Sequence, residues 1–107
     1  MEIINLTGHA ITVRTKDGDC VIPPAETFRI RYSTRGLGTL NTKYGNIPIT
    51  QNVYLRVKNP PPIQEGVIYI VSRLVAETYP ERDDFYMTNG LIKEKGKPVA
   101  CRSLGKI

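Results

Sequence analysis

The stretch Gly66-Val67-Ile68-Tyr69-Ile70-Val71-Ser72-Arg73-Leu74-Val75-Ala76-Glu77-Thr78-Tyr79-Pro80 decides the fold. Residues 67–71 are an unbroken run of β-branched and aromatic types, which is the pattern of a strand buried on both faces. Ser72 suits an N-cap, residues 74–76 give the next turns an apolar face, and Pro80 ends the helix. The sequence therefore predicts a buried strand that runs into a short helix, and the first N–H groups of that helix offer a place for an anion.

Length and composition limit the class of protein. The chain has 107 residues, which suits one hydrophobic core, so we expect residues 1–107 to form a single ligand-binding domain. No apolar run approaches the roughly 18 residues of a membrane span, and the N-terminus lacks the order of a signal peptide. Cys20 and Cys101 are too few for a disulfide framework. We expect a cytoplasmic protein with reduced thiols and no membrane partner.

The charge distribution favours an anionic partner. The formal net charge is +5. Residues 20–58 contain six arginine and lysine residues against Glu26 alone, whereas acidic residues gather between positions 77 and 84. A basic middle of this kind is typical of proteins that bind nucleotides, nucleic acid or acidic surfaces. A solvated basic face that serves only solubility explains the charge equally well.

Most of the remaining chain has the two-residue period of β-strands. Residues 10–15 alternate, the pair Asp17-Gly18 predicts a tight hairpin turn with positive φ at both central residues, and residues 20–22 return as the second strand. Residues 27–32 alternate most regularly, with Phe28, Ile30 and Tyr32 on one face and Arg29 and Arg31 on the other. Two guanidinium groups on one face could straddle phosphates, although solvated arginines are the better expectation.

Residues 33–46 are rich in glycine, threonine and asparagine and predict a long loop or a loose hairpin. Further strands are expected at residues 47–49, as an edge strand because of Pro48, and at residues 53–57. After the helix, residues 85–87 predict a short strand that stops at residues 88–90, and residues 91–104 predict a closing hairpin around residues 94–96. The expected fold is α+β: a mainly antiparallel sheet of about eight short, hairpin-connected strands with one short helix packed on it.

Catalytic groups are scarce in the sequence. His9 is the single histidine and lies in a polar turn, where a capping or surface role is the usual one. A nucleophilic pair of His9 with Cys20 or Cys101 remains open, but no neighbouring residue activates either thiol. The acids at residues 81–84 lack the partners of a metal site. We therefore expect no enzyme activity, no catalytic residue, no metal and no cofactor.

Several residues suit a nucleotide-like ligand. Tyr79, Phe85 and Tyr86 offer aromatic faces for a base, Arg56, Arg82 and Arg102 offer positive charge for phosphates, and Asn89 has the paired donor and acceptor that read an adenine edge. Each has a structural alternative. Phe85 also fits a core, Tyr79 a helix end, Asn89 a turn before Gly90, and the arginines a charged surface.

The order of the segments resembles that of a known family. The similarity rests on Ile4-Asn5-Leu6-Thr7-Gly8-His9-Ala10-Ile11-Thr12-Val13, on Ile22-Pro23-Pro24 after the hairpin, on residues 65–76, on Arg82-Asp83-Asp84 and on the closing hairpin. In these motifs, which run nearly end to end, the chain is similar to a family of small phage and prophage proteins. That family includes the Thoeris anti-defence sponge, which sequesters cyclic ADP-ribose isomers made by bacterial TIR-domain enzymes.

The resemblance implies binding without turnover in the cytoplasm of an infected bacterial host. It implies a homo-oligomer that is built from dimers, expected to be a hexamer, and that withholds glycocyclic ADP-ribose from the defence effector; some members also hold cyclic oligonucleotides at a second site. By position, Tyr79 and then Phe85 match the family's aromatic wall, Asn89 its amide contact, and Arg56 and Arg102 its phosphate contacts. Residues 66–80 then serve chiefly as a core that places these groups.

A second hypothesis from another class stays open. A small basic β-domain that binds nucleic acid would use the Arg29 and Arg31 face as its footprint, and that face is also a candidate second anion site. The leading hypothesis involves no nucleic acid, and a purely structural phage part is a third, less informative option.

Overall fold

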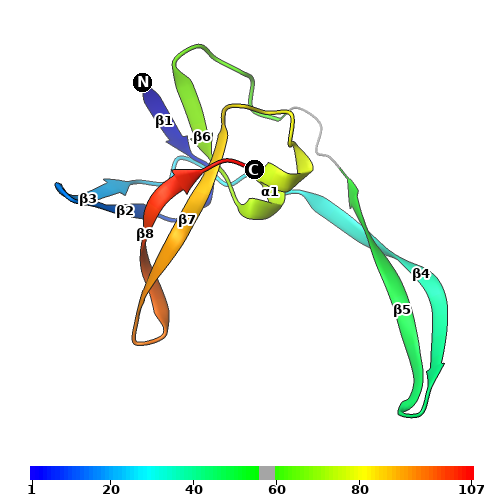
Figure 1. Ribbon diagram of the computed structural model, residues 1–107. Helices are drawn as coiled ribbons and strands as arrows, with labels where there is room; N and C mark the ends of the chain where they lie inside the picture. The colour runs from blue at the N-terminus through cyan, green and yellow to red at the C-terminus, as the bar shows by residue number, and fades with distance from the viewer. Residues whose placement is uncertain (56–59) are drawn as a thin grey trace.

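The computed structural model describes residues 1–55 and 60–107, and the side chains of Tyr32, Tyr54 and Leu55 are outside the description. The described residues form eight strands and one helix (Figure 1). In chain order these are β1 (Glu2–Asn5), β2 (Ile11–Thr15), β3 (Gly18–Ile22), β4 (Arg31–Thr42), β5 (Gly45–Leu55), β6 (Val67–Ile70), α1 (Arg73–Thr78), β7 (Phe85–Glu94) and β8 (Lys97–Gly105). The predicted number of strands and the single short helix are confirmed.

The strand-to-helix junction forms as predicted. The backbone N–H of Val75 donates to the Ser72 hydroxyl over 3.3 Å, so Ser72 is the N-cap of α1. Of the predicted apolar face at residues 74–76, Val75 and Ala76 are buried, whereas Leu74 is 36 % exposed, so the prediction is wrong for Leu74. Six helical residues make fewer than two turns, so packing against the sheet stabilises α1 more than its own hydrogen bonds do.

The main sheet is mixed, which corrects the prediction of a mainly antiparallel sheet. Its strand order is β1-β6-β7-β8-β2-β3. The hairpins β2–β3 and β7–β8 are antiparallel, but β1 pairs in parallel with β6, β6 with β7, and β2 with β8. Parallel neighbours need a long crossover connection rather than a tight turn. The connection from β6 to β7 contains α1, and the connection from β1 to β6 contains β2 to β5.

The sheet separates two clusters of apolar side chains. Alternate residues of β6 point to opposite faces: Tyr69 packs in a cluster that includes α1, and Ile70 packs in a second cluster with Ile11 and Cys101. Along the chain, residues 28–30 are not a strand, yet the predicted alternation of burial holds because Ile30 is buried and Arg29 is exposed. The first cluster is the larger and forms the main core.

Two predicted turns differ from the structure. In the β2–β3 turn the sequence predicts a positive φ at both Asp17 and Gly18. Of these two residues, Gly18 alone has a positive φ. Residues 88–90 do not end the short predicted strand: β7 continues through them to Glu94 and pairs with β8 along its length. Gly90 lies inside β7 and has a φ of 67°, an angle that favours glycine. The Asn89-Gly90 pair that predicted a turn is therefore used for this local backbone angle within a continuous strand.

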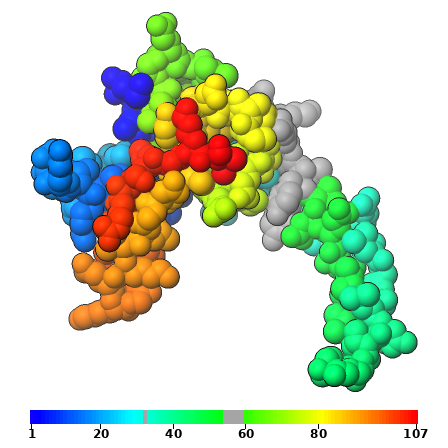
Figure 2. All heavy atoms as spheres, in the orientation of Figure 1, coloured from blue at the N-terminus to red at the C-terminus, as the bar shows by residue number. Residues whose placement is uncertain are grey.

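Residues 31–55 form a separate two-stranded sheet that projects from the rest of the chain (Figures 1 and 2). The hairpin alternative for residues 33–46 is therefore correct, and the long loop is wrong. Strand β4 begins at Arg31 rather than at Thr27, and the predicted strand at residues 47–49 is part of a longer β5 that includes Pro48. The end of the predicted strand at residues 53–57 lies outside the described residues. We call β4 and β5 together the arm.

Candidate functional site

The loop between β1 and β2 is held by the buried side chain of Asn5, which is 1 % exposed. Its amide nitrogen donates to the carbonyl oxygens of His9 (2.8 Å) and Ile22 (3.1 Å). Its amide oxygen accepts from the backbone N–H (3.0 Å) and the hydroxyl (2.6 Å) of Thr7. These four hydrogen bonds hold the loop that contains His9 in one conformation, so the Cα atom of His9 has a defined position.

Gly8 allows the same loop to lie close to the side chain of Thr27. It has a φ of 87°, and a methyl carbon at this position would lie 2.5 Å from the Thr27 hydroxyl oxygen. Only glycine combines that backbone angle with that contact at low cost. The sequence analysis treated residues 5–9 as a polar turn and missed the roles of Asn5 and Gly8. An asparagine two residues before a hydroxyl residue, followed by glycine, is the pattern of a side-chain-stabilised turn and was the available indication.

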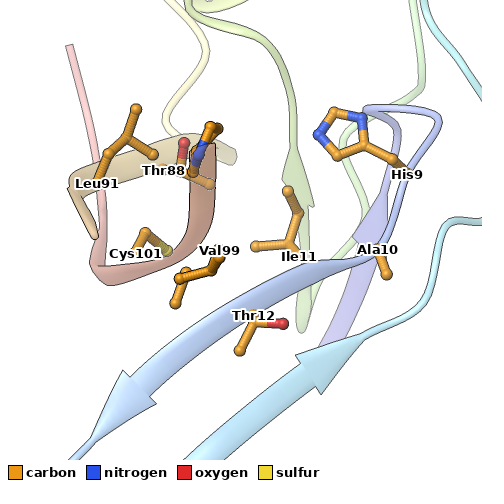
Figure 3. A pocket seen from close by; sticks show the side chains of 10 residues that line it. His9, Ala10, Ile11, Thr12, Thr88, Leu91, Val99 and Cys101 are labelled. Carbon is orange, nitrogen blue, oxygen red and sulfur yellow. The ribbon is translucent and has the colours of Figure 1, made fainter. Parts of the chain in front are cut away.

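Two adjoining hollows lie beside this loop. The first has a volume of about 350 Å³ and opens between β2 and the β7–β8 hairpin (Figure 3). The second, of about 190 Å³, lies at the start of α1. Both are lined by His9, Ile11 and Thr88. The larger volume falls within the range of about 300–1,000 Å³ that is usual for small-molecule sites. We call the two hollows together the His9 groove.

The divergence of two parallel strands creates the larger hollow. Strands β2 and β8 are paired at one register position, Val13 with Cys101. Towards Ala10 the two backbones separate, and the side chains of Ile11, Thr12 and Val99 face the space between them (Figure 3). The wall is therefore mostly apolar, with the His9 imidazole and the hydroxyl groups of Thr12 and Thr88 as polar groups. Such a mixture suits an organic ligand with a few hydrogen-bonding atoms.

The smaller hollow has both polar and apolar side chains in its wall. Besides the three shared residues it is lined by Thr7, Ser72, Arg73 and Asn89 and by the apolar Val71 and Met87. The Arg73 side chain is 77 % exposed, and its Nε donates to Glu77 over 2.9 Å. The Ser72 hydroxyl oxygen already accepts the capping N–H of Val75. A helix of six residues offers little dipole, so the side chains around the hollow, rather than the helix end, define what it can bind.

Asn89 and Arg102 occupy neighbouring positions in the β7–β8 ladder, and both are exposed. Asn89 is paired with Ser103, and its side chain lies so close to Gly105 that a methyl group there would overlap the amide. The Arg102 side chain crosses Gly90, since a methyl carbon on Gly90 would lie 3.1 Å from the Arg102 Cβ. Of these two predicted ligand residues, Asn89 lines the smaller hollow of the His9 groove, whereas Arg102 lines neither hollow.

Tyr79 and Phe85 are core residues, with exposed fractions of 4 % and 2 %. Their rings meet edge to face with centroids 6.0 Å apart, and Tyr79 also contacts Phe28 in this way. The hollow that they line holds only about 40 Å³, room for about one water molecule. In this structure neither ring presents a face to a base, which corrects the expectation of an aromatic wall at Tyr79 or Phe85.

Arg82 is engaged in the protein interior. Its guanidinium donates to both carboxylate oxygens of Asp84, each over 2.8 Å, and lies 4.3 Å above the centroid of the Phe85 ring. The hydrogen bond from Asp84 raises the pKa of Arg82. The sequence analysis offered Arg82 as a phosphate contact and treated residues 80–84 as a polar turn. The structure shows a structural ion pair in its place.

The remaining predicted residues lie elsewhere. Arg29 is exposed before β4, and Arg31 is exposed as the first residue of β4, so they do not share a strand. Arg56 lies outside the described residues. Among the side chains that the structure describes, no group of three or more acidic, cysteine or histidine residues is placed to hold a metal ion, and no helix is long and apolar enough to cross a membrane.

The two cysteines differ in environment. Both are unpaired thiols, as expected; Cys20 is exposed and Cys101 is 1 % exposed. Burial raises the pKa of the Cys101 thiol. Cys101 lines the larger hollow with His9, but its raised pKa keeps the thiol protonated and therefore weakly nucleophilic at neutral pH.

The chain was compared with models of protein families, with curated proteins and with solved structures. None of the three comparisons gives a match.

Proposed function

We propose that the protein binds a cyclic nucleotide signal and holds it without cleaving it. The observation that carries the proposal is the His9 groove, in which two adjoining hollows of about 350 and 190 Å³ each have both apolar and polar side chains in their walls, with Arg73 and Asn89 beside the smaller one. A cyclic nucleotide also combines both kinds of surface, because its base is flat and its ribose and phosphates are polar. The hydroxyl, imidazole and amide groups of the groove can hydrogen-bond these parts.

The ligand that we propose is glycocyclic ADP-ribose. This choice rests on the resemblance of the sequence motifs to the family that includes the Thoeris anti-defence sponge. In that role the protein acts as an oligomer in the cytoplasm of a phage-infected bacterium and keeps the Thoeris effector inactive by removing its activator. Binding without turnover is supported by the Cys101 thiol, which lines the larger hollow together with His9 and whose raised pKa keeps it protonated.

Calorimetry with glycocyclic ADP-ribose tests the proposal. We expect tight binding and recovery of intact ligand when the complex is heated. Arg73→Ala removes the exposed cation that lines the smaller hollow, and we expect it to weaken binding by about 1.5–3 kcal/mol if Arg73 contacts a phosphate. Arg29→Ala is the matched control, because Arg29 is also an exposed arginine and lies outside the groove.

Two results would contradict this proposal. Recovery of a cleaved ligand would make the protein an enzyme. Failure to bind any cyclic nucleotide, with steeply salt-dependent binding to single-stranded DNA or RNA, would support the nucleic-acid hypothesis. That hypothesis expected Arg29 and Arg31 on one strand face, and only Arg31 lies in β4.

A further inference from the structure

Another hollow lies between β1 and the chain that precedes β6. Its volume is about 400 Å³, and it shares no lining residue with the His9 groove. Figure 1 shows residues 60–66 arriving at the start of β6 beside the start of β1, and these two strands are paired from Glu2 and Val67 onwards. Residues 26–28 contribute the remaining wall. We call this space the β1 hollow.

Apolar and aromatic side chains form much of the wall of the β1 hollow. Ile4 and Phe28 are half-buried and pack against the main core, of which Tyr69 is a buried member. Pro61 and Pro62 add two rigid apolar rings. The volume falls within the range of about 300–1,000 Å³ that is usual for small-molecule sites. The wall therefore suits the apolar body of an organic molecule.

Hydrogen-bond donors beside the β1 hollow are largely used within the protein. The backbone N–H of Phe28 donates to the carbonyl oxygen of Leu6 over 3.1 Å. Residues 60–62 are prolines and have no N–H to offer. The Tyr69 hydroxyl donates to the carbonyl oxygen of Pro62 over 2.8 Å. An anionic group in the hollow would therefore lose its hydration and meet few donors in exchange.

Glu26 gives the β1 hollow a negative charge. Its carboxylate is the only charged group among the described side chains of the wall. Thr27 and Gln64, the other polar residues, can accept hydrogen bonds as well as donate them. Arg29 is close in the sequence but does not line the hollow. The wall thus has a carboxylate with no cation of its own beside it.

The chain around the β1 hollow has the same sign of charge. Residues 2–6, 24–28 and 60–66 form or adjoin its walls, and they contain three glutamates and no lysine, arginine or histidine. The formal net charge of the whole chain is +5, so the charge is reversed here. A concave surface of one sign concentrates ions of the opposite sign. This hollow therefore attracts cations and repels phosphates.

We propose that the β1 hollow binds a small organic cation whose ammonium or guanidinium group lies on the Glu26 carboxylate and whose apolar body lies against Phe28 and Tyr69. The cation donates to the carboxylate in a charge-assisted hydrogen bond, and the aromatic rings also attract positive charge. The ligand is opposite in charge to a cyclic nucleotide. The inference does not rest on the proposed function, because the two sites have separate walls.

NMR titration of the full chain with probes of similar shape and different charge tests the proposal. At neutral pH 2-phenylethylamine is a cation, 2-phenylethanol is neutral and phenylacetate is an anion. We expect the amine to bind at least about fivefold more tightly than the alcohol, and phenylacetate to bind most weakly. Added salt should weaken binding of the amine and leave that of the alcohol unchanged. The signals of Ile4 and Gln64 should shift, while those of Ile11 and Thr88 in the His9 groove should not.

Glu26→Gln keeps the shape of an exposed side chain and removes its charge. It should bring the affinities of the amine and the alcohol within about twofold of each other, because the carboxylate carries the preference. Glu94→Gln is the matched control, since the Glu94 side chain is 66 % exposed and lies outside the hollow. This variant should keep the wild-type preference for the amine.

Several outcomes would overturn the inference. Equal affinities of the wild-type protein for the amine and the alcohol would do so, as would no shift of Ile4 at about 10 mM amine. Displacement of the amine by glycocyclic ADP-ribose would place the amine in the His9 groove. A blocked lysine tripeptide that binds at least about tenfold more tightly than the amine would make the hollow a peptide site. A protein that binds glycocyclic ADP-ribose but not the amine would overturn this inference and leave the proposed function standing.

Discussion

Arg82 and Asp84 form a bidentate ion pair in which both hydrogen bonds are 2.8 Å long, and only 9 % and 11 % of the two side chains are exposed. Both residues lie in the turn that precedes β7, where the Asp84 carbonyl oxygen also accepts the backbone N–H of Tyr69 over 2.8 Å. The pair thus connects the turn after α1 to the centre of the sheet. Removing one member leaves a buried charge without its partner.

Arg82→Ala should therefore lower the free energy of unfolding by about 3–5 kcal/mol, measured by urea denaturation. A double variant, Arg82→Met with Asp84→Leu, should recover most of this loss because no unpaired charge remains. Arg14→Ala is the control: Arg14 pairs with Asp19 in an exposed setting (42 % for both side chains), and the unfolding midpoint should hardly change. An Arg82→Ala protein as stable as wild type would show that the pair is not structural.

Asn5→Ala should destabilise the protein by about 2–4 kcal/mol. The substitution removes the four hydrogen bonds of the buried amide and leaves the His9 and Ile22 carbonyl oxygens without these donors. It should also weaken ligand binding, because the loop that carries His9 loses its support. Thermal unfolding and calorimetry measure the two effects. Asn52→Ala, at an exposed position of β5, is the control and should change neither quantity.

The two thiols should react at very different rates. An aromatic disulfide reagent should modify one thiol per chain within seconds, and Cys20→Ser should abolish this fast phase because Cys20 is exposed and Cys101 is buried. Unfolding in urea should release the second thiol. Two fast thiols in the native wild-type protein would contradict the burial of Cys101.

Cys101 should also make the stability depend on pH in the alkaline range. Its pKa is raised by burial in the folded state, so the folded protein keeps a proton that the unfolded chain loses. The contribution is fully present below the unfolded thiol pKa of about 8.5 and falls as the pH rises above it. Unfolding curves between pH 7 and 10 should show this decline, and Cys101→Ala should have a shallower one despite its lower overall stability.

Gly105→Ala separates the position of Asn89 from the stability of the fold. The added methyl group would overlap the Asn89 amide and must displace it. We expect the loss of ligand affinity to match that of Asn89→Ala, with a change in the free energy of unfolding below about 1 kcal/mol because the Asn89 side chain is flexible and exposed. Gly36→Ala meets no atom within 4 Å and should leave affinity unchanged. Unchanged affinity in Gly105→Ala would exclude Asn89 as a contact.

Local patterns predicted the local structure well. The capped helix at residues 72–78, the β2–β3 hairpin and the last hairpin each depend on residues a few positions apart, and all three form. The parallel pairs were missed because the partner of β1 is β6, more than 60 positions away, and no periodicity within β1 encodes that choice. The arm was uncertain because glycine and asparagine are depleted in strands, while its ladder forms through the pairing of β4 with β5.

The candidate site was predicted only in part. Asn89 lines the groove but Arg102 does not, and Tyr79, Phe85 and Arg82 suit a ligand by type but are used by the core. Residue type does not determine burial, because the same ring can pack or be exposed depending on which strands become neighbours. The groove itself arises where β2 departs from β8, and a sequence contains no direct sign of such a departure.

The single register pair between Val13 and Cys101 also bears on local stability. The β2–β3 hairpin forms one edge of the six-stranded sheet, and its backbone is paired with β8 at this one position. Strands with few backbone pairings open at a smaller free-energy cost than central strands do, so the amides of β2 should exchange hydrogen faster than those of β6. The wall that β2 contributes to the larger hollow is therefore expected to open more readily than the wall formed by the β7–β8 hairpin.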